Sequence, residues 1–442
     1  MQNPRLAVKQ WLRRVTGSIA FFPTIIALAF IVLALLLIWV EYQPWLMDIK
    51  ESMDVVMVES EEDGRLVLGT LVASTISLMV FSFSMVMVVL NQASANLSPR
   101  LLPGLITAKD NQVVMGVYLG TICFCLMLIL NIHPDADERR IPGFGILVGL
   151  CFGLACLALF AYFIHSISQA IQVDHILDRL LQQTLSKLRK SLGAEKFIEP
   201  DTSGWSTLNA PCAGYLKWIQ EDELLRLCCE YDVQLQMTDR IGYFYVANAP
   251  YVRVNKELDQ TIAEKVHQCF LFYPQERLGD HYSFGFKQIS EVAVKSLSPG
   301  INDPATAIKA IDMLVMLFIE KCSSEEICIL NDKKGAARIF LQPTSFDDLL
   351  RQNITPIREY AKRDPIVMRH LLNGMCKVRQ MLRNEDCTLT LVRHAIAVRD
   401  SCDEALTNAL DRASINEEIE TFNQRHHEQA LALLKCYTEP KS

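Results

Sequence analysis

Charged residues are absent from four long stretches of this sequence, although Asp, Glu, Lys and Arg make up 21% of its 442 residues. No Asp, Glu, Lys, Arg or His occurs in any of them, and each is close to the about 20 residues that cross a bilayer as a helix. The stretches are Ile19–Val40, Leu66–Leu90, Val113–Ile132 and Phe144–Ile164. The sequence therefore predicts four transmembrane helices. The lack of a charged or histidine side chain inside them disfavours a proton- or sodium-coupled transporter.

The chain also lacks an excess of basic residues and the common catalytic motifs. Its formal net charge of −7 argues against a nucleic-acid-binding protein. It contains no phosphate-binding GxxxxGK[ST] loop, no GxSxG elbow, no HExxH and no paired CxxC motif. We therefore expect no enzymatic activity, no cofactor, no metal site and no nucleic-acid partner.

Charge in the loops predicts the orientation in the membrane. Residues 1–18 carry no acid and four bases, which are Arg5, Lys9, Arg13 and Arg14. Residues 41–65 carry eight acids against Lys50 and Arg65. By the positive-inside rule the N-terminus is cytoplasmic, and four spans return the C-terminal part to the same side. None of the 14 cysteines lies in a predicted outer loop, which is typical of free thiols in a reducing compartment.

Polar residues recur along the second span. Thr70, Ser77, Ser84, Asn91 and Ser98 are seven residues apart, and Ser74 is one turn from Thr70. Seven residues nearly complete two helical turns, so these side chains form one stripe that should face other helices or water. Two interpretations remain open, a helix-packing face and the lining of an aqueous path in an oligomer. Arg100, near the cytoplasmic end, suits the mouth of such a path and also suits a plain topological anchor.

Small residues in the third and fourth spans predict close helix packing. Gly116 and Gly120 are four residues apart, and Gly145, Gly149 and Gly153 form a double GxxxG run. Such faces let helices approach closely, either within one chain or between subunits.

The chain divides into five predicted segments, and most of its C-terminal part reads as helix. The segments are a cytoplasmic N-terminus (1–18), a four-helix membrane domain (19–164), a connecting helix (165–192), a cytoplasmic α+β domain (193–344) and a helical region (345–442). Periodicity and caps predict a linker over residues 193–215, a helix from an Asn255 cap to Phe272 and a last helix over Ile415–Tyr437. Further helices are expected at Glu221–Tyr231, His281–Lys295, Pro304–Lys321, Phe346–Lys362, Pro365–Arg383 and Leu389–Leu410, and strands at Tyr215–Ile219, Val233–Met237, Tyr243–Ala247 and Tyr251–Val254.

The break between two of these helices is the most distinctive part of the sequence. Asp303 followed by Pro304 is ordinary chemistry for the start of a helix. One interpretation of the break is therefore helix capping alone. The other is a polar pocket or subunit contact, formed by Ser298, Asn302, Asp303 and Thr306.

Several segments resemble a known family of bacterial membrane proteins. The strongest is LSPGINDPATA at Leu297–Ala307, preceded by GFKQISEVA at Gly285–Ala293. LNQASANLSPR at Leu90–Arg100 and GYLKWI at Gly214–Ile219 are similar to two more of its segments. Together they resemble the predicted membrane proteins of domain of unknown function 2254. The resemblance implies four spans and a cytoplasmic domain, and it implies no reaction.

These observations predict an α-helical protein of the bacterial inner membrane, with four transmembrane helices and a C-terminal cytoplasmic α+β and helical domain. The leading functional hypothesis is a homo-oligomeric ion or small-solute pore, lined by Thr70, Ser74, Ser77, Ser84, Asn91 and Arg100 and gated by the cytoplasmic domain. The alternative is a membrane-anchored sensor or scaffold whose cytoplasmic domain binds a ligand or a protein partner. In both cases the lipid bilayer is the partner of the spans.

Overall fold

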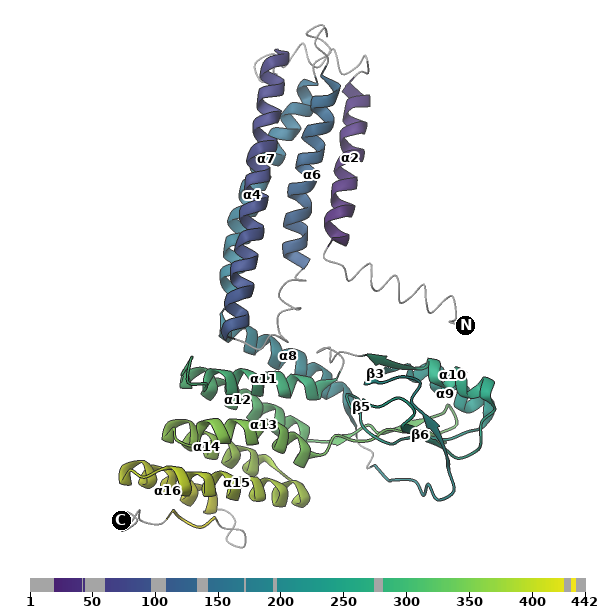
Figure 1. Ribbon diagram of the computed structural model, residues 1–442, viewed down its shortest axis with the longest axis vertical. Coiled ribbons are helices and arrows are strands. Elements are labelled where there is room, and N and C mark those ends of the chain that lie inside the picture. The colour runs from purple at the N-terminus through teal and green to yellow at the C-terminus, as the bar shows by residue number, and fades with distance from the viewer. Residues whose placement is uncertain are drawn as a thin grey trace. The chain divides into compact units, whose positions relative to one another are not determined.

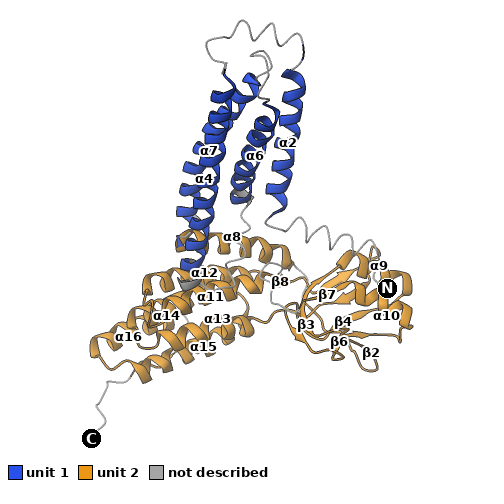
Figure 2. Ribbon diagram, turned by 45° about the horizontal axis from the view of Figure 1, so that its top comes forward, with its two compact units in different colours: residues 1–95, 101–172 blue, residues 96–100, 173–442 orange. Residues whose placement is uncertain are grey.

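The computed structural model describes residues 20–41, 43, 60–96, 109–132, 142–170, 172–193, 197–273, 281–424 and 431–434. The chain forms two compact units, residues 1–95 with 101–172 and residues 96–100 with 173–442 (Figure 2). We refer to them as the membrane unit and the C-terminal unit and describe each by itself.

The membrane unit contains the four expected helices (Figure 1). They are α2 (Phe21–Glu41), α4 (Glu61–Asn96), α6 (Lys109–Asn131) and α7 (Gly143–Ala170). Each is long and apolar enough to cross a membrane, with mean hydropathy between 2.1 and 2.9 over its most apolar window. The prediction of four candidate spans is therefore confirmed, and α4 and α7 extend beyond the apolar stretches at both ends.

Glycines let these helices approach closely within one chain. A Cβ atom added at Gly116 or Gly120 of α6 would lie 2.7 Å from the side chain of Ile26 or Phe30 of α2. One added at Gly153 of α7 would lie 2.6 Å from Leu71 of α4. Half of the apolar window of α6 is buried, against 17% of the window of α4. Helix α6 is therefore the central helix of the unit, and α4 is one of its exposed helices.

At one end of this unit, two charged side chains form hydrogen bonds with backbone groups at the ends of neighbouring helices. Glu41, at the end of α2, accepts a hydrogen bond from the backbone N–H of Phe144 at the start of α7 (2.8 Å). Arg65, in the first turns of α4, donates to the carbonyl oxygen of Ile132 just after α6 (2.7 Å). A negative charge stabilises a helix N-terminus and a positive charge a C-terminus. The end of α2 therefore lies beside the start of α7, and the start of α4 beside the end of α6.

The C-terminal unit combines small sheets with a stack of helices. One sheet has the strand order β2-β6-β4-β10-β9, with β10 parallel to β4 and the other pairs antiparallel, and a second has the order β5-β3-β7. Strands β1 and β8 form a separate antiparallel pair. The strands are β1 (Leu192–Gly193), β2 (Ser206–Asn209), β3 (Gly214–Ile219), β4 (Leu235–Met237), β5 (Phe244–Tyr245), β6 (Pro250–Val254), β7 (Phe270–Tyr273), β8 (Glu325–Glu326), β9 (Ile329–Asn331) and β10 (Ala337–Phe340).

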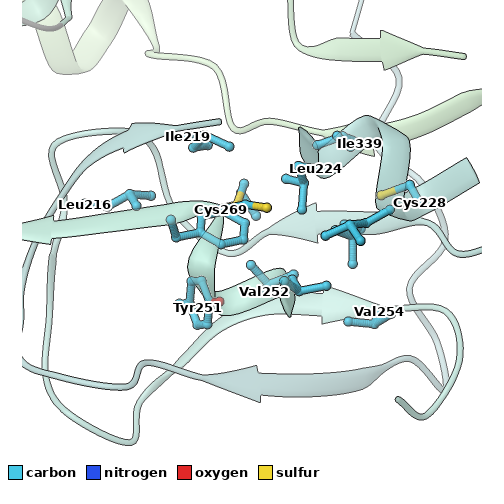
Figure 3. Packing of buried hydrophobic residues seen from close by; sticks show 14 of the residues in the cluster. Leu216, Ile219, Leu224, Cys228, Tyr251, Val252, Val254, Cys269 and Ile339 are labelled. Carbon is cyan, nitrogen blue, oxygen red and sulfur yellow. The ribbon is translucent and has the colours of Figure 1, made fainter. Parts of the chain in front are cut away.

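The core of the sheet region is apolar and fully enclosed (Figure 3). Helices α9 (Glu221–Tyr231) and α10 (Gln260–Gln268) accompany the sheets. Leu224 and Cys228 of α9 pack with Tyr251 and Val252 of β6 and with Ile339 of β10. Burial of this apolar surface is the main stabilising contribution to the region.

The remaining helices form stacked antiparallel pairs, α11 with α12, α13 with α14 and α15 with α16, while α8 packs against α11 and α12 (Figure 1). The helices are α8 (Val173–Ser191), α11 (Tyr282–Ser296), α12 (Pro304–Lys321), α13 (Phe346–Ala361), α14 (Pro365–Met381), α15 (Glu385–Ala405) and α16 (Ala409–Asn423). Helices α11 to α16 each begin at a capping side chain that accepts a backbone N–H; these are His281, Asp303, Ser345, Asp364, Asn384 and Asn408. Although α11 and α12 precede the expected boundary at residue 345, they pack with α8, α13 and α14 rather than with the sheets.

Three predicted helices differ from the structure. The helix expected over Leu389–Leu410 is α15, which ends at Ala405, and Leu410 already belongs to α16. The helix expected from Asn255 to Phe272 is α10, which begins after Asp259 and ends at Gln268. The aromatic segment that follows it forms strand β7, because it pairs with β3. The last helix ends at Asn423 instead of continuing to Tyr437. There the Asn423 amide bonds both the N–H (2.7 Å) and the carbonyl (2.8 Å) of Leu431, which holds residues 431–434 in a non-helical segment.

Two connecting segments also differ from expectation. The connecting helix predicted over 165–192 is interrupted, because α7 ends at Ala170 and α8 begins at Val173. Helix α8 is amphipathic and buries Leu177, Leu181 and Leu188 within the C-terminal unit, so it belongs to a different apolar core from α7. The segment predicted as a linker contains β2, which pairs with β6.

Candidate functional site

The polar stripe of the second span lies on the open side of α4 in the membrane unit. Thr70, Ser74, Ser77, Ser84 and Asn91 are all exposed. Three of the hydroxyls donate a hydrogen bond to the carbonyl oxygen four residues earlier, at 2.7 Å for Thr70, 3.0 Å for Ser77 and 2.9 Å for Ser84. Among the described residues of the membrane unit, the stripe therefore does not serve as a packing face.

A second series on α4 forms that packing face. Leu68, Thr75, Ser82 and Val89 are also seven residues apart, and all four are buried. Thr70, Ser77, Ser84 and Asn91 each follow one of them by two residues, which is about 200° of rotation on a helix. This series was not predicted from the sequence. The equal spacing of the buried residues was the available signal.

Arg100, the predicted mouth of the path, lies outside the described residues, as does Ser98. Their position relative to the stripe is therefore inferred only from their spacing in the sequence.

The turn between α11 and α12 uses its polar atoms internally. The Asp303 carboxylate accepts hydrogen bonds from the backbone N–H (3.2 Å) and the hydroxyl (2.6 Å) of Thr306, as the capping interpretation predicts. The Ser298 hydroxyl donates to the carbonyl of Lys295 (2.7 Å). Asn302 has a positive φ of 49° and an exposed side chain, which is typical of asparagine in a tight turn. These contacts explain the motif as a helix connection, and a ligand role for it stays a prediction.

A buried polar cluster that the sequence did not reveal lies at the end of α12. The Glu326 carboxylate accepts hydrogen bonds from Lys321 Nζ (2.6 Å), the Tyr282 hydroxyl (2.8 Å) and the backbone N–H of Thr344 (3.0 Å). The side chains of Lys321 and Glu326 are each only 9% exposed. His281 Nε2 lies 3.9 Å from the same carboxylate. These residues come from α11, α12, β8 and the segment before α13, so no local motif marks them.

A cleft of about 360 Å³, which we call the lysine cleft, opens beside this cluster within the C-terminal unit. Three of the side chains that line it are cationic, Lys187 and Lys190 of α8 and Lys217 of β3. Trp218, also in its wall, is 43% exposed. Burial lowers the pKa of Lys187, and Glu221 and Asp239 contribute carboxyl groups to the same wall. The three lysines are balanced by three carboxyl groups, those of Glu221, Asp239 and Glu326, and together with Trp218 they suit a polar ligand with a planar group.

The charges around this cleft act on His281. Burial lowers the pKa of His281 to about 4; Glu326 opposes the shift, and the charges of Lys321, Arg240 and Lys187 add to it. Its Nδ1 accepts the backbone N–H of Ser283 (3.3 Å), which assigns the proton of the neutral ring to Nε2. Protonation of Nδ1 would remove this helix cap.

We expect acid to destabilise the C-terminal unit through His281. The unfolded chain takes up the proton at the ordinary pKa of about 6.5, whereas the folded protein does so only near pH 4. The stabilising contribution is therefore complete above pH 6.5 and is lost as the pH falls, by roughly 2 kcal/mol at pH 5. Chemical denaturation of the full chain in detergent at pH 7 and pH 5 should show this loss. The His281→Asn variant keeps a capping side chain but lacks the titrating ring, so its stability should fall by roughly 2 kcal/mol less between pH 7 and pH 5. Equal losses of stability in the variant and the wild-type protein would contradict the role given to His281.

Comparison with known proteins shows that these features lie in a region shared with a known family. The model of the family described as "Predicted membrane protein (DUF2254)" matches residues 16–376, which include the stripe, the turn between α11 and α12 and the lysine cleft. The chain belongs to this family. The DUF2254 match ends within α14, so α15 and α16 lie beyond it.

Two curated relatives of this DUF2254 chain are uncharacterized proteins of Mycobacterium bovis and Mycobacterium tuberculosis. Each is 26% identical over 340 residues, covering 72% of this chain and 64% of the relative. The chain thus spans less than two thirds of the length of these relatives. No solved structure matches the chain.

Proposed function

We propose that this DUF2254 protein assembles into a homo-oligomer in which α4 helices from several subunits line a path for ions or small solutes. The observation that carries the proposal is the direction of the polar stripe. Its hydroxyls and its asparagine point away from the packing face of their own unit. In a single subunit they would face hydrocarbon, whereas around a shared axis they would face water.

The length of the stripe supports the same proposal. Thr70 and Asn91 are 21 residues apart on one continuous helix, α4. At about 1.5 Å per residue the stripe runs for roughly 30 Å, which equals the thickness of the hydrocarbon core of a bilayer. The hydrogen bonds from Thr70, Ser77 and Ser84 to their own backbone lower the free-energy cost of exposing these hydroxyls to lipid. A stripe that faces lipid is therefore the alternative that the experiment below must distinguish from a water-filled path.

We place the protein in the bacterial inner membrane, with four spans and both termini in the cytoplasm. The basic N-terminal segment and the acidic segment before α4 support this orientation. The C-terminal unit is then cytoplasmic and is the part available to gate the path.

Cysteine accessibility tests the direction of the stripe in the membrane. Ser77→Cys and Ser84→Cys should react with a charged, water-soluble thiol reagent in intact liposomes, because reaction requires a hydrated thiolate. Ile76→Cys and Phe83→Cys are matched controls, since both residues are exposed apolar neighbours at the same depth, about 100° around the helix. We expect the two serine positions to react at least about tenfold faster than the controls. The variants are made in a Cys151→Ser/Cys212→Ser/Cys229→Ser background because these three cysteines are exposed, and labelling is read on the peptide that carries the introduced cysteine. Equal, slow labelling of all four would contradict a water-filled path.

The second candidate function is a membrane-anchored sensor. Its supporting observation is the lysine cleft, with Lys187, Lys190 and Lys217 beside Trp218. Such a sensor would bind a polar ligand with a planar group in the C-terminal unit while its spans act only as an anchor. Loss of binding in a Lys217→Met variant without any solute flux in the parent protein would favour this function.

A further inference from the structure

Two cysteines far apart in the sequence meet in the C-terminal unit. Cys322 is the C-cap of α12, and Cys387 is the third residue of α15. Their side chains interact, and each affects the pKa of the other. Both side chains are half-buried and line one cavity of about 640 Å³, so a small reagent reaches them from solvent.

The two thiols are chemically unequal. Cys387 lies in the first turn of α15, where its backbone N–H bonds the capping side chain of Asn384 (3.4 Å) and the helix presents its positive end. The interaction with Cys322 lowers the pKa of Cys387, against the opposing effects of burial and of the Glu325 and Asp386 charges. The interaction with Cys387, followed by burial, raises the pKa of Cys322. The position of Cys387 at the positive end of α15 makes it the nucleophile of the pair.

We propose that Cys322 and Cys387 form an oxidisable dithiol, which a peroxide converts into a disulfide that joins the end of α12 to the start of α15. In the first step the Cys387 thiolate attacks one peroxide oxygen and the O–O bond breaks. With hydrogen peroxide this gives a sulfenic acid on Cys387 and hydroxide, which takes up a proton to form water. The Cys322 sulfur then attacks the Cys387 sulfur, loses its proton and displaces a second water. The two thiols lose two electrons, and the peroxide gains them.

Other thiols in the described part of the chain differ from this pair. Burial raises the pKa to about 12 for four cysteines enclosed in apolar cores, which are Cys228, Cys269, Cys328 and Cys402. Cys212 is exposed and lies in the sheet region, far in sequence from both residues of the pair. Cys387 also lies beyond residue 376, the last that the family model matches.

Peptide mapping of the full-length protein tests the proposal. The reduced protein in detergent is treated with hydrogen peroxide, remaining thiols are blocked with N-ethylmaleimide, and the protein is digested with trypsin without reductant. Cleavage after Lys321 and Arg383 gives the peptides Cys322–Lys333 and Asn384–Arg393. We expect these two peptides joined, with a mass about 2 Da below the sum of Asn384–Arg393 and of Cys322–Lys333 alkylated at Cys328, and separate again after reduction.

Serine variants identify which two cysteines form the disulfide. Because Cys328 lies in the same peptide as Cys322, the joined product must survive in Cys328→Ser and disappear in Cys322→Ser and in Cys387→Ser. Cys212→Ser is the control and should keep it. Recovery of both pair members as N-ethylmaleimide adducts from oxidised wild-type protein would overturn the proposal, as would a joined product that persists in Cys322→Ser.

A second measurement needs no variant and is therefore independent of their folding. In reduced wild-type protein near pH 7, iodoacetamide should modify Cys387 several-fold faster than the more exposed Cys212, because its thiolate fraction is larger. Slower modification of Cys387 than of Cys212 would contradict its role as the nucleophile.

Discussion

Replacing Lys321 by Met should lower the free energy of unfolding of the C-terminal unit by about 3–5 kcal/mol. Lys321 is the cationic partner of Glu326, and both side chains are 9% exposed. The substitution leaves the Glu326 carboxylate with the Tyr282 hydroxyl and the Thr344 N–H but without a compensating charge. A buried, uncompensated charge is among the costliest defects in a folded protein.

A second lysine on the same helix provides the control. Lys309 of α12 pairs with Asp174 of α8 at 2.8 Å, but the Asp174 side chain is 72% exposed, so solvent screens the pair. Lys309→Met should cost at most about 1 kcal/mol. Both variants are compared by chemical denaturation of the full chain in detergent, and Lys321→Met/Glu326→Gln should recover part of the loss. Equal effects of the two single substitutions would show that the buried cluster does not stabilise the unit.

Features set by neighbouring residues were predictable from the sequence. Helix α12 runs over Pro304–Lys321 as expected, because Asp303 and Pro304 define its start through contacts within one turn. Helix α9 likewise has its predicted bounds. The four spans followed from the length of uncharged apolar sequence, which the bilayer dictates without reference to tertiary structure.

Features set by distant partners were not predictable in the same way. Strand β7 was expected to be helical, and only its pairing with β3 explains its conformation. Strands β8, β9 and β10 are two to four residues long, too short for a clear alternation of polar and apolar residues. The Glu326 cluster and the Cys322–Cys387 pair depend on the stacking of whole helices, which brings together residues that share no local spacing.

The stripe shows the same division between local and distant information. Its seven-residue step was visible in the sequence, but its direction depends on which face of α4 meets α7. Gly149 and Gly153 of α7 receive Leu68 and Leu71 of α4, and this contact turns Ser77 and Ser84 outward. The seven-residue spacing alone was compatible with a stripe on the packing face or on the exposed face of α4.

Leucine at two positions of the stripe should abolish conduction. Ser77→Leu/Ser84→Leu replaces two hydroxyls with bulky apolar groups about 10 Å apart along α4. In a path lined by several copies of the helix, each substitution becomes a ring of leucines, and two such rings close a narrow pore by excluding water. Ile76→Leu/Phe83→Leu changes the neighbouring exposed apolar positions at the same depth and should leave conduction intact.

Solute flux from liposomes that contain the purified protein tests the central claim most directly. The account predicts ion flux above that of empty liposomes for the wild-type protein and for Ile76→Leu/Phe83→Leu. It predicts flux at the empty-liposome level for Ser77→Leu/Ser84→Leu, with the oligomeric state unchanged in size-exclusion chromatography. Absence of wild-type flux across several salts, voltages and membrane tensions would contradict a pore and favour the anchored sensor, as would unchanged flux through the leucine variant.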